Sequence, residues 1–212
     1  MAVAALPRER APEHPRLAPG MMGMYIFLAS EIMFFGSLFA TYFYLASSHT
    51  HWPPGGFTPV EPIPVPAVNT VVLLSSGVTM HISHLAIQAG NRRRFISWLV
   101  VTIVLGTGFE IGQVYEFLRA EVFRTFTANE FATAFFTMTG FHGLHVLGGL
   151  IFLVIVLARA LGGQFSAQHH VGVAAGAIYW HFVDIVWVFL YGILYWVIVA
   201  STGNPVAHVF GF

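Results

Sequence analysis

Five apolar segments, each long enough to cross a lipid bilayer, dominate this chain of 212 residues. A membrane-spanning helix needs about 20 predominantly apolar residues. Because no water reaches the hydrocarbon, backbone polar groups there must bond to one another, which favours helices. The sequence therefore predicts an all-α fold, a polytopic membrane bundle of five transmembrane helices. We expect the helices near residues 22–46, 67–89, 96–118, 130–159 and 174–201.

The five segments are expected to form one transmembrane domain, residues 22–201. A polar N-terminal tail, 1–21, and a short C-terminal tail, 202–212, would flank it. The N-terminal tail is rich in proline, and no apolar region precedes a small-residue cleavage site. We therefore expect no cleavable secretory signal and a first span that stays in the membrane.

The composition agrees with a membrane protein and excludes several kinds of site. Charged residues make up 8% of the chain, against about 25% in soluble domains. There is no cysteine, which excludes disulfides, thiolate metal sites and iron–sulfur clusters. The formal net charge is zero, so the broad basic surface that nucleic-acid binding needs is missing.

The distribution of arginine predicts the orientation. Seven of the nine basic residues lie on the side of the membrane that holds the N-terminus, here called the proximal side: Arg8, Arg10, Arg16, Arg92, Arg93, Arg94 and Arg159. Arg119 and Arg124 lie on the distal side. Because cytoplasmic loops carry an excess of basic residues, we expect the N-terminus inside and the C-terminus outside.

Ionisable side chains within the spans are costly and mark candidate functional sites. Glu31 lies deep in the first span, and His181 and Asp184 lie three residues apart in the last, so they share a helix face. We expect Glu31 to bond to one of three histidines: His142, His145 or His181. Together with Asp184 these residues would form a buried polar centre, with a proton-linked or gating role for Glu31 as the alternative.

A second group of polar side chains follows a three-residue spacing on the third span: Glu110, Gln113 and Glu116. We interpret them as an interior polar stripe that holds helices together. A water-lined path is the alternative.

The histidines also raise the possibility of a haem or metal site. His81 and His84 repeat the spacing of His142 and His145, and a long-range cluster with His181 would be needed to bind a metal. No span carries the Glu-x-x-His pair of di-iron bundles. We therefore interpret the histidines as helix-packing residues.

Seven motifs occur in order along residues 22–200. They are Ser30-Glu31 with Met33-Phe34-Phe35; Trp52-Pro53-Pro54; Asn69-Thr70 with Leu73-Leu74-Ser75-Ser76-Gly77; His84 with Gly90-Asn91-Arg92; Leu105-Gly106 with Phe109, Gln113 and Glu116; Phe135-Phe136 with Thr139 through Val146; and His169-His170 with Trp180 through Trp187. In this order they resemble the subunit III family of the haem–copper terminal oxidases.

The resemblance implies a non-catalytic subunit that supports the catalytic subunit in aerobic electron transport and proton uptake. No catalytic residue, metal ligand or cofactor is then expected on this chain. Haem and copper would lie in partner subunits, with catalytic subunit I and subunit II among the partners. The family's carbodiimide-reactive carboxylate matches Glu31. Bound phospholipid is expected, with these headgroup candidates: His84, Arg159, His169 and His170.

The resemblance is greatest to the short, five-helix bacterial form, which implies a bacterial cytoplasmic membrane. Longer members carry two more N-terminal helices, which border a lipid cleft. Some members also have an acidic residue where this chain has Ala174, so a role that depends on that carboxylate is not carried over.

Within the family, the residues from Trp180 to Asp184, followed by Val188 to Tyr191, favour the cytochrome c type. Three other functions are compatible with parts of the sequence pattern. Subunit III of a quinol oxidase or a nitric oxide reductase-associated homologue is the alternative. A standalone haem- or metal-binding membrane enzyme is a remote one. A transporter ranks lowest, because the sequence has no paired halves.

Overall fold

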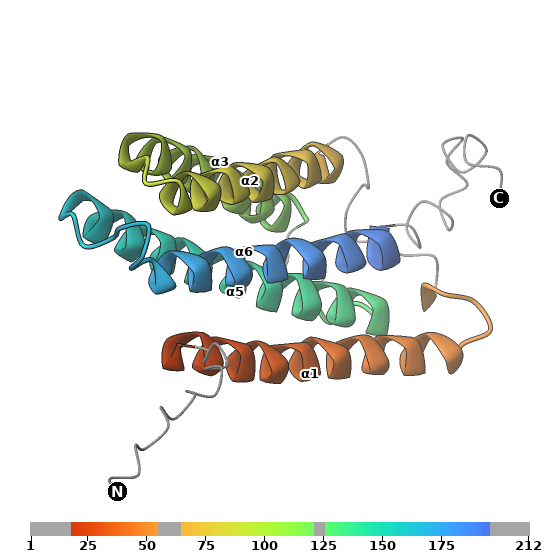
Figure 1. The fold of residues 1–212 in the computed structure, drawn as a ribbon. Helices are drawn as coiled ribbons and strands as arrows, with labels where there is room; N and C mark the ends of the chain where they lie inside the picture. Colours follow the sequence, from red (N-terminus) through yellow and green to blue (C-terminus); the bar gives the residue numbers. More distant parts are fainter. Residues whose placement is uncertain (1–17, 55–64, 121–125, 196–212) are drawn as a thin grey trace, which may run out of the picture.

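The computed structural model describes residues 18–54, 65–120 and 126–195. These residues contain five long helices: α1 (Pro19–Ser47), α2 (Val65–Gln88), α3 (Arg92–Arg119), α5 (Glu130–Leu161) and α6 (Val171–Leu190). A π-helical turn, η2 (Tyr191–Tyr195), continues α6. Five helices are long and apolar enough to cross a membrane, and the described residues contain no strand. The predicted all-α bundle of five spans is confirmed (Figure 1).

The observed helices differ from the expected segments by a few residues. Helix α1 begins at Pro19 rather than at residue 22, since proline suits the first turn of a helix. Helix α6 begins at Val171 rather than at residue 174. The predicted end of the last span, 196–201, lies outside the described residues, as do residues 1–17 and 202–212 of the predicted tails.

Local side-chain chemistry determines where several helices begin and end. Asn91 accepts a hydrogen bond from the backbone N–H of Arg94 at 3.0 Å, and Asn129 accepts one from Ala132 at 2.7 Å. Both are N-caps, which satisfy donors that the first helical turn leaves free. Gly90, with φ of 73°, follows α2 in the left-handed conformation common after helix ends. Gly90 and Asn91 together build the tight turn between α2 and α3.

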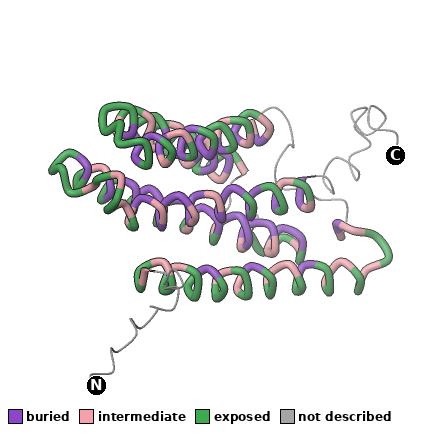
Figure 2. Tube along the Cα trace, viewed as in Figure 1, coloured by how far each residue is buried: buried purple, intermediate pink, exposed green. Residues whose placement is uncertain are grey.

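Four of the helices form a closed ring, and the fifth lies against one side of it. Helix α2 contacts α3 and α6, and α5 contacts α3 and α6. Helix α1 packs on α5 and α6, on the side away from α2 and α3 (Figure 1). It buries three residues, Leu28, Phe35 and Tyr42, and is otherwise largely exposed (Figure 2). Helix α1 is therefore the helix with the weakest apolar attachment.

Two tryptophans of α6 form hydrogen bonds with side chains of α2. Trp180 and Trp187 are fully buried, and their indole N–H groups donate to hydroxyls of Ser76 at 2.9 Å and Thr70 at 3.0 Å. A buried indole N–H needs such a partner, because an unpaired donor in an apolar interior is costly. These hydrogen bonds fix how α6 is rotated against α2.

Arg92 joins the proximal ends of two helices. Its Nη2 donates to the carbonyl oxygens of Ala160 at 3.0 Å and Leu161 at 2.8 Å, at the C-terminus of α5. We expect Arg92→Leu to lower the free energy of unfolding by about 1–2 kcal/mol, because charge-assisted bonds to the last carbonyls are lost. Thermal unfolding in detergent tests this, with Arg93→Leu as the control. Arg93 makes no side-chain hydrogen bond within the described residues, so equal effects of both changes would contradict the prediction.

Candidate functional site

Helices α1 and α5 bring a carboxylate and an imidazole together. Glu31 Oε2 lies 2.8 Å from His145 Nε2, and each side chain is 17% exposed. The other ring nitrogen, Nδ1, lies 2.7 Å from the backbone oxygen of Phe141. A carbonyl only accepts, so Nδ1 carries a hydrogen. Nε2 is thereby directed at the carboxyl group of Glu31, and the two polar groups are hydrogen-bond partners.

The surroundings of this pair are apolar and aromatic. The rings of Phe34 and Phe35 lie 5.9 and 4.9 Å from the imidazole of His145, measured between centroids. Tyr179 of α6 donates to the backbone oxygen of His145 at 2.9 Å. Glu31 lies 12 residues after the start of α1, or about 18 Å along the helix, near its middle. An unpaired charge at this position would be costly. The contact between Glu31 and His145 therefore holds α1 against α5.

His142 lies in a different place from His145. It is completely buried, and its ring stacks on Trp187 at 5.0 Å and meets the edge of Phe109 at 5.9 Å, between centroids. Neither ring nitrogen has a hydrogen-bond partner among the described residues. Two residues three positions apart on a helix differ by about 60° of rotation. That difference turns His145 toward α1 and His142 toward α3 and α6.

The polar stripe of α3 lies against α5. Gln113 donates to the backbone oxygen of Thr139 at 2.6 Å, and Tyr195 of η2 donates to Glu116 at 3.3 Å. Glu110 lies level with Gly143, where a Cβ would be 3.4 Å from its carboxylate. The stripe thus spans the α3–α5 interface and reaches η2 through its distal member.

His181 and Asp184 lie on the α2–α6 interface, apart from both other groups. Their Nδ1 and Oδ2 atoms are 3.6 Å apart, longer than a hydrogen bond. The carboxylate of Asp184 is buried against Gly77 of α2, so closely that a Cβ at Gly77 would collide with it. The expected single polar centre is therefore distributed over three interfaces. The buried carboxylate of the neighbouring helix explains why a residue without a side chain lies at position 77, which the residue pattern alone does not indicate.

Comparison with known proteins identifies the family. The family model described as cytochrome c oxidase subunit III matches residues 16–199. The chain belongs to the cytochrome c oxidase subunit III family. Curated relatives named cytochrome c oxidase subunit 3 match most of the chain. Those of Papio hamadryas and Aedes aegypti are 44% identical over 179 residues, 82% of this chain and 68% of theirs. That of Paracentrotus lividus is 46% identical over 178 residues, 82% of this chain and 67% of its own. The resemblance to the subunit III family, and the interpretation of the chain as a subunit III of the cytochrome c oxidase type, are confirmed.

In this member of the subunit III family, the described side chains that could bind a metal ion lie apart from one another. Among the described residues, no group of three or more histidine or acidic side chains could hold a metal ion. The residues that a standalone haem or metal enzyme would use lie on separate interfaces: Glu31 and His145 between α1 and α5, His142 in the core, and His181 beside α2.

The lipid-headgroup candidates lie at or near the proximal end of the bundle. The imidazole rings of His84 and His170 are 5.9 Å apart between centroids. Arg159 stacks its guanidinium over Phe165 at 5.1 Å and donates to Gln164 at 2.9 Å. His169 is exposed in the same connection. Cationic and imidazole groups thus lie at the ends of α2 and α5 and at the start of α6.

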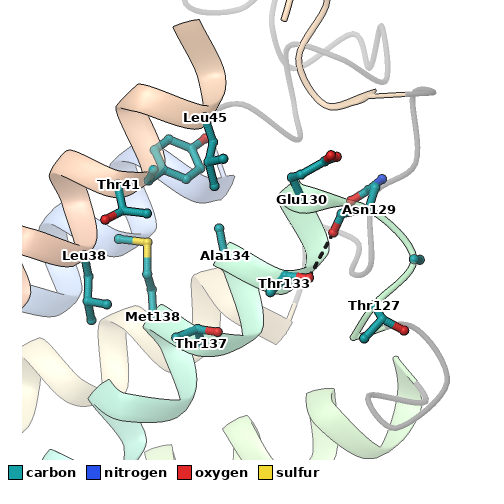
Figure 3. Close-up of a pocket in the computed structure, with 12 residues that line it drawn as sticks. Leu38, Thr41, Leu45, Thr127, Asn129, Glu130, Thr133, Ala134, Thr137 and Met138 are labelled. Carbon is teal, nitrogen blue, oxygen red and sulfur yellow. Dashed lines mark hydrogen bonds between the residues drawn. The ribbon is translucent and has the colours of Figure 1, made fainter. Parts of the chain in front are cut away.

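A cavity of about 510 Å³ lies between α1 and the distal end of α5 (Figure 3). Leu38, Ala134 and Met138 supply apolar walls, and Thr133 and Thr137 add hydroxyls. None of the site residues predicted from the sequence lines it. The four-residue spacing of the two threonines, which share a helix face, is the signal that could have indicated it.

Proposed function

We propose that this chain supports the catalytic subunit of a cytochrome c oxidase without performing the redox chemistry itself. Its ionisable groups, spread over three helix interfaces, suit a subunit that stabilises a complex. One observation carries the proposal: Glu31 and His145 pair at 2.8 Å, near the middle of α1, in a member of the subunit III family. In this proposal haem and copper lie in partner subunits, and the partners include catalytic subunit I and subunit II.

The Glu31–His145 pair is proposed to keep α1 in place and thereby to prolong the active life of the oxidase and support its proton uptake. The test compares purified complexes that carry the native chain or Glu31→Leu. We expect similar initial rates of cytochrome c oxidation, because the pair lies outside the redox centres, but fewer turnovers before inactivation in the variant. Equal lifetimes, with α1 equally stable, would refute this role.

We propose that the proximal cluster binds phospholipid headgroups through Arg159, with His84, His169 and His170 nearby. A guanidinium matches phosphate geometry, and stacking on Phe165 holds it in place. Arg159→Ala is expected to reduce the phospholipid that survives detergent washing by at least one molecule per chain, measured by native mass spectrometry. Arg93→Ala, an exposed arginine on the same side, is the control. Equal retention in both variants would contradict the proposal.

We propose a multi-pass location in a bacterial cytoplasmic membrane, with the N-terminus inside. The arginine bias supports the orientation; the relatives named above are animal proteins and give no support for a bacterial origin. The chain has no cysteine, so single cysteines can report sidedness. Ser166→Cys, between α5 and α6, should be protected from an impermeant maleimide in intact cells. Thr127→Cys, before α5, should react, and the reverse pattern would overturn the orientation.

A further inference from the structure

We infer that the exposed face of α2 and α6 around His81 and His181 is a docking surface for a transmembrane helix of another oxidase subunit. The inference rests on the proposed function, which supplies a complex for this chain to join. It adds which face is covered and what chemistry the covering helix brings.

Two imidazoles meet on this face at membrane depth. The rings of His81 and His181 are 6.3 Å apart between centroids. His81 is exposed, and the side chain of His181 keeps 41% of its surface exposed. His81 lies seven residues before the end of α2, and His181 lies ten residues after the start of α6. These positions are about 10 and 15 Å from the proximal helix ends.

The surface around the two rings is apolar. Val78 and Leu85 flank His81 on α2, Ile185 follows His181 on α6, and all three are exposed. Lipid tails offer no hydrogen-bond partner, so polar side chains in spans face protein or water-filled cavities. An apolar face with two central imidazoles therefore suits a protein interface better than a lipid-facing surface.

Within the described residues, the chain offers these two imidazoles one weak contact. Within the described residues, His81 makes no hydrogen bond or ion pair. His181 has Asp184 as its nearest acid, at 3.6 Å, and that carboxylate is buried behind it against Gly77. A second copy docked through the same face would present further imidazoles, and the nearby carboxylate of its Asp184 is only 7% exposed. The complementary occupant is a helix of a different subunit with a hydrogen-bond acceptor level with the two rings.

Photo-crosslinking in the intact complex tests the inference. The crosslinker p-benzoylphenylalanine replaces Val78 or Ile185, which flank the histidines, and Met33, on the exposed side of α1, is the control position. We expect products that join this chain to another oxidase subunit from Val78 and Ile185, and none from Met33. A complex that forms normally but gives no protein crosslink from this face would overturn the inference, as would crosslinks to a second copy.

A histidine variant separates the two possible environments, protein or lipid, by the sign of its effect. His81→Leu leaves the contact between His181 and the buried Asp184 in place, so the isolated chain should unfold at an unchanged temperature. It should weaken retention of the partner subunit by about tenfold during detergent washing. On a lipid-facing surface the same change would leave retention equal or improved, which would refute the inference. Failure of the unmodified chain to co-purify with any catalytic subunit would refute the proposed function itself, and the docking surface with it.

Discussion

Replacing Gly106 with alanine is expected to lower the free energy of unfolding by about 1–3 kcal/mol, because the new methyl group would overlap a buried indole. A Cβ here would lie 2.6 Å from Cζ2 of Trp180 and 3.0 Å from Cδ2 of Leu150. The indole is also bordered by α5, where a Cβ at Gly149 would lie 3.0 Å from it. Its N–H is held by Ser76. The glycine thus leaves room on α3 for the Trp180 side chain of α6.

Gly36→Ala is the matched control for this substitution. No heavy atom among the described residues lies within 4 Å of the methyl position at Gly36, outside its immediate chain surroundings. Alanine is a better helix former than glycine, so this change should be neutral or stabilise α1 by about 0.5–1 kcal/mol. Thermal unfolding in detergent compares the two. Adding Trp180→Phe to Gly106→Ala should restore part of the lost stability, and an unchanged melting temperature for Gly106→Ala alone would contradict the packing.

Separating Glu31 from His145 is the second change expected to have a large effect. Glu31→Leu leaves a ring nitrogen without a partner, and His145→Leu leaves a carboxyl group without one. Each single change should cost about 1–3 kcal/mol of unfolding free energy, the penalty of a polar group left unsatisfied. The side chains are 17% exposed, so we do not expect the larger cost of a fully buried ion pair.

The double variant tests whether the two side chains act as a pair. Changing both to leucine removes the unsatisfied group, so it should cost less than the sum of the single changes. Glu31→Gln should stay close to the native stability, because its amide can donate to the Nε2 atom that faces it. Additive single effects, measured by thermal unfolding, would show that Glu31 and His145 contribute independently.

The helices could be predicted from the sequence because apolar length and caps are local properties. The resemblance indicated the family, which the comparisons confirm. From the sequence alone, three histidines remain possible hydrogen-bond partners of Glu31. Periodicity gives the face of a residue on its own helix, but not how a neighbouring helix is rotated and placed. His142 and His145 illustrate this, since the position of α1 decides which of them meets Glu31.

Other contacts depend on pairs of residues far apart in the chain. The spacing of His181 and Asp184 predicts that the two residues share a helix face, and in the structure they do. The spacing does not predict that the carboxylate of Asp184 is buried against Gly77. The attachment of Arg92 to the end of α5 joins residues 68 and 69 positions apart. Such contacts follow from the assembled bundle, and a single sequence carries no signal for them.

The central claim, an accessory subunit without a redox centre of its own, is tested most directly by purification. The tagged chain is isolated from its native membrane in mild detergent, and the bound proteins are identified by mass spectrometry alongside an optical spectrum. We predict that a haem–copper catalytic subunit co-purifies and that the chain is colourless after the complex is dissociated. A chain that purifies alone and carries its own haem or metal would contradict the account.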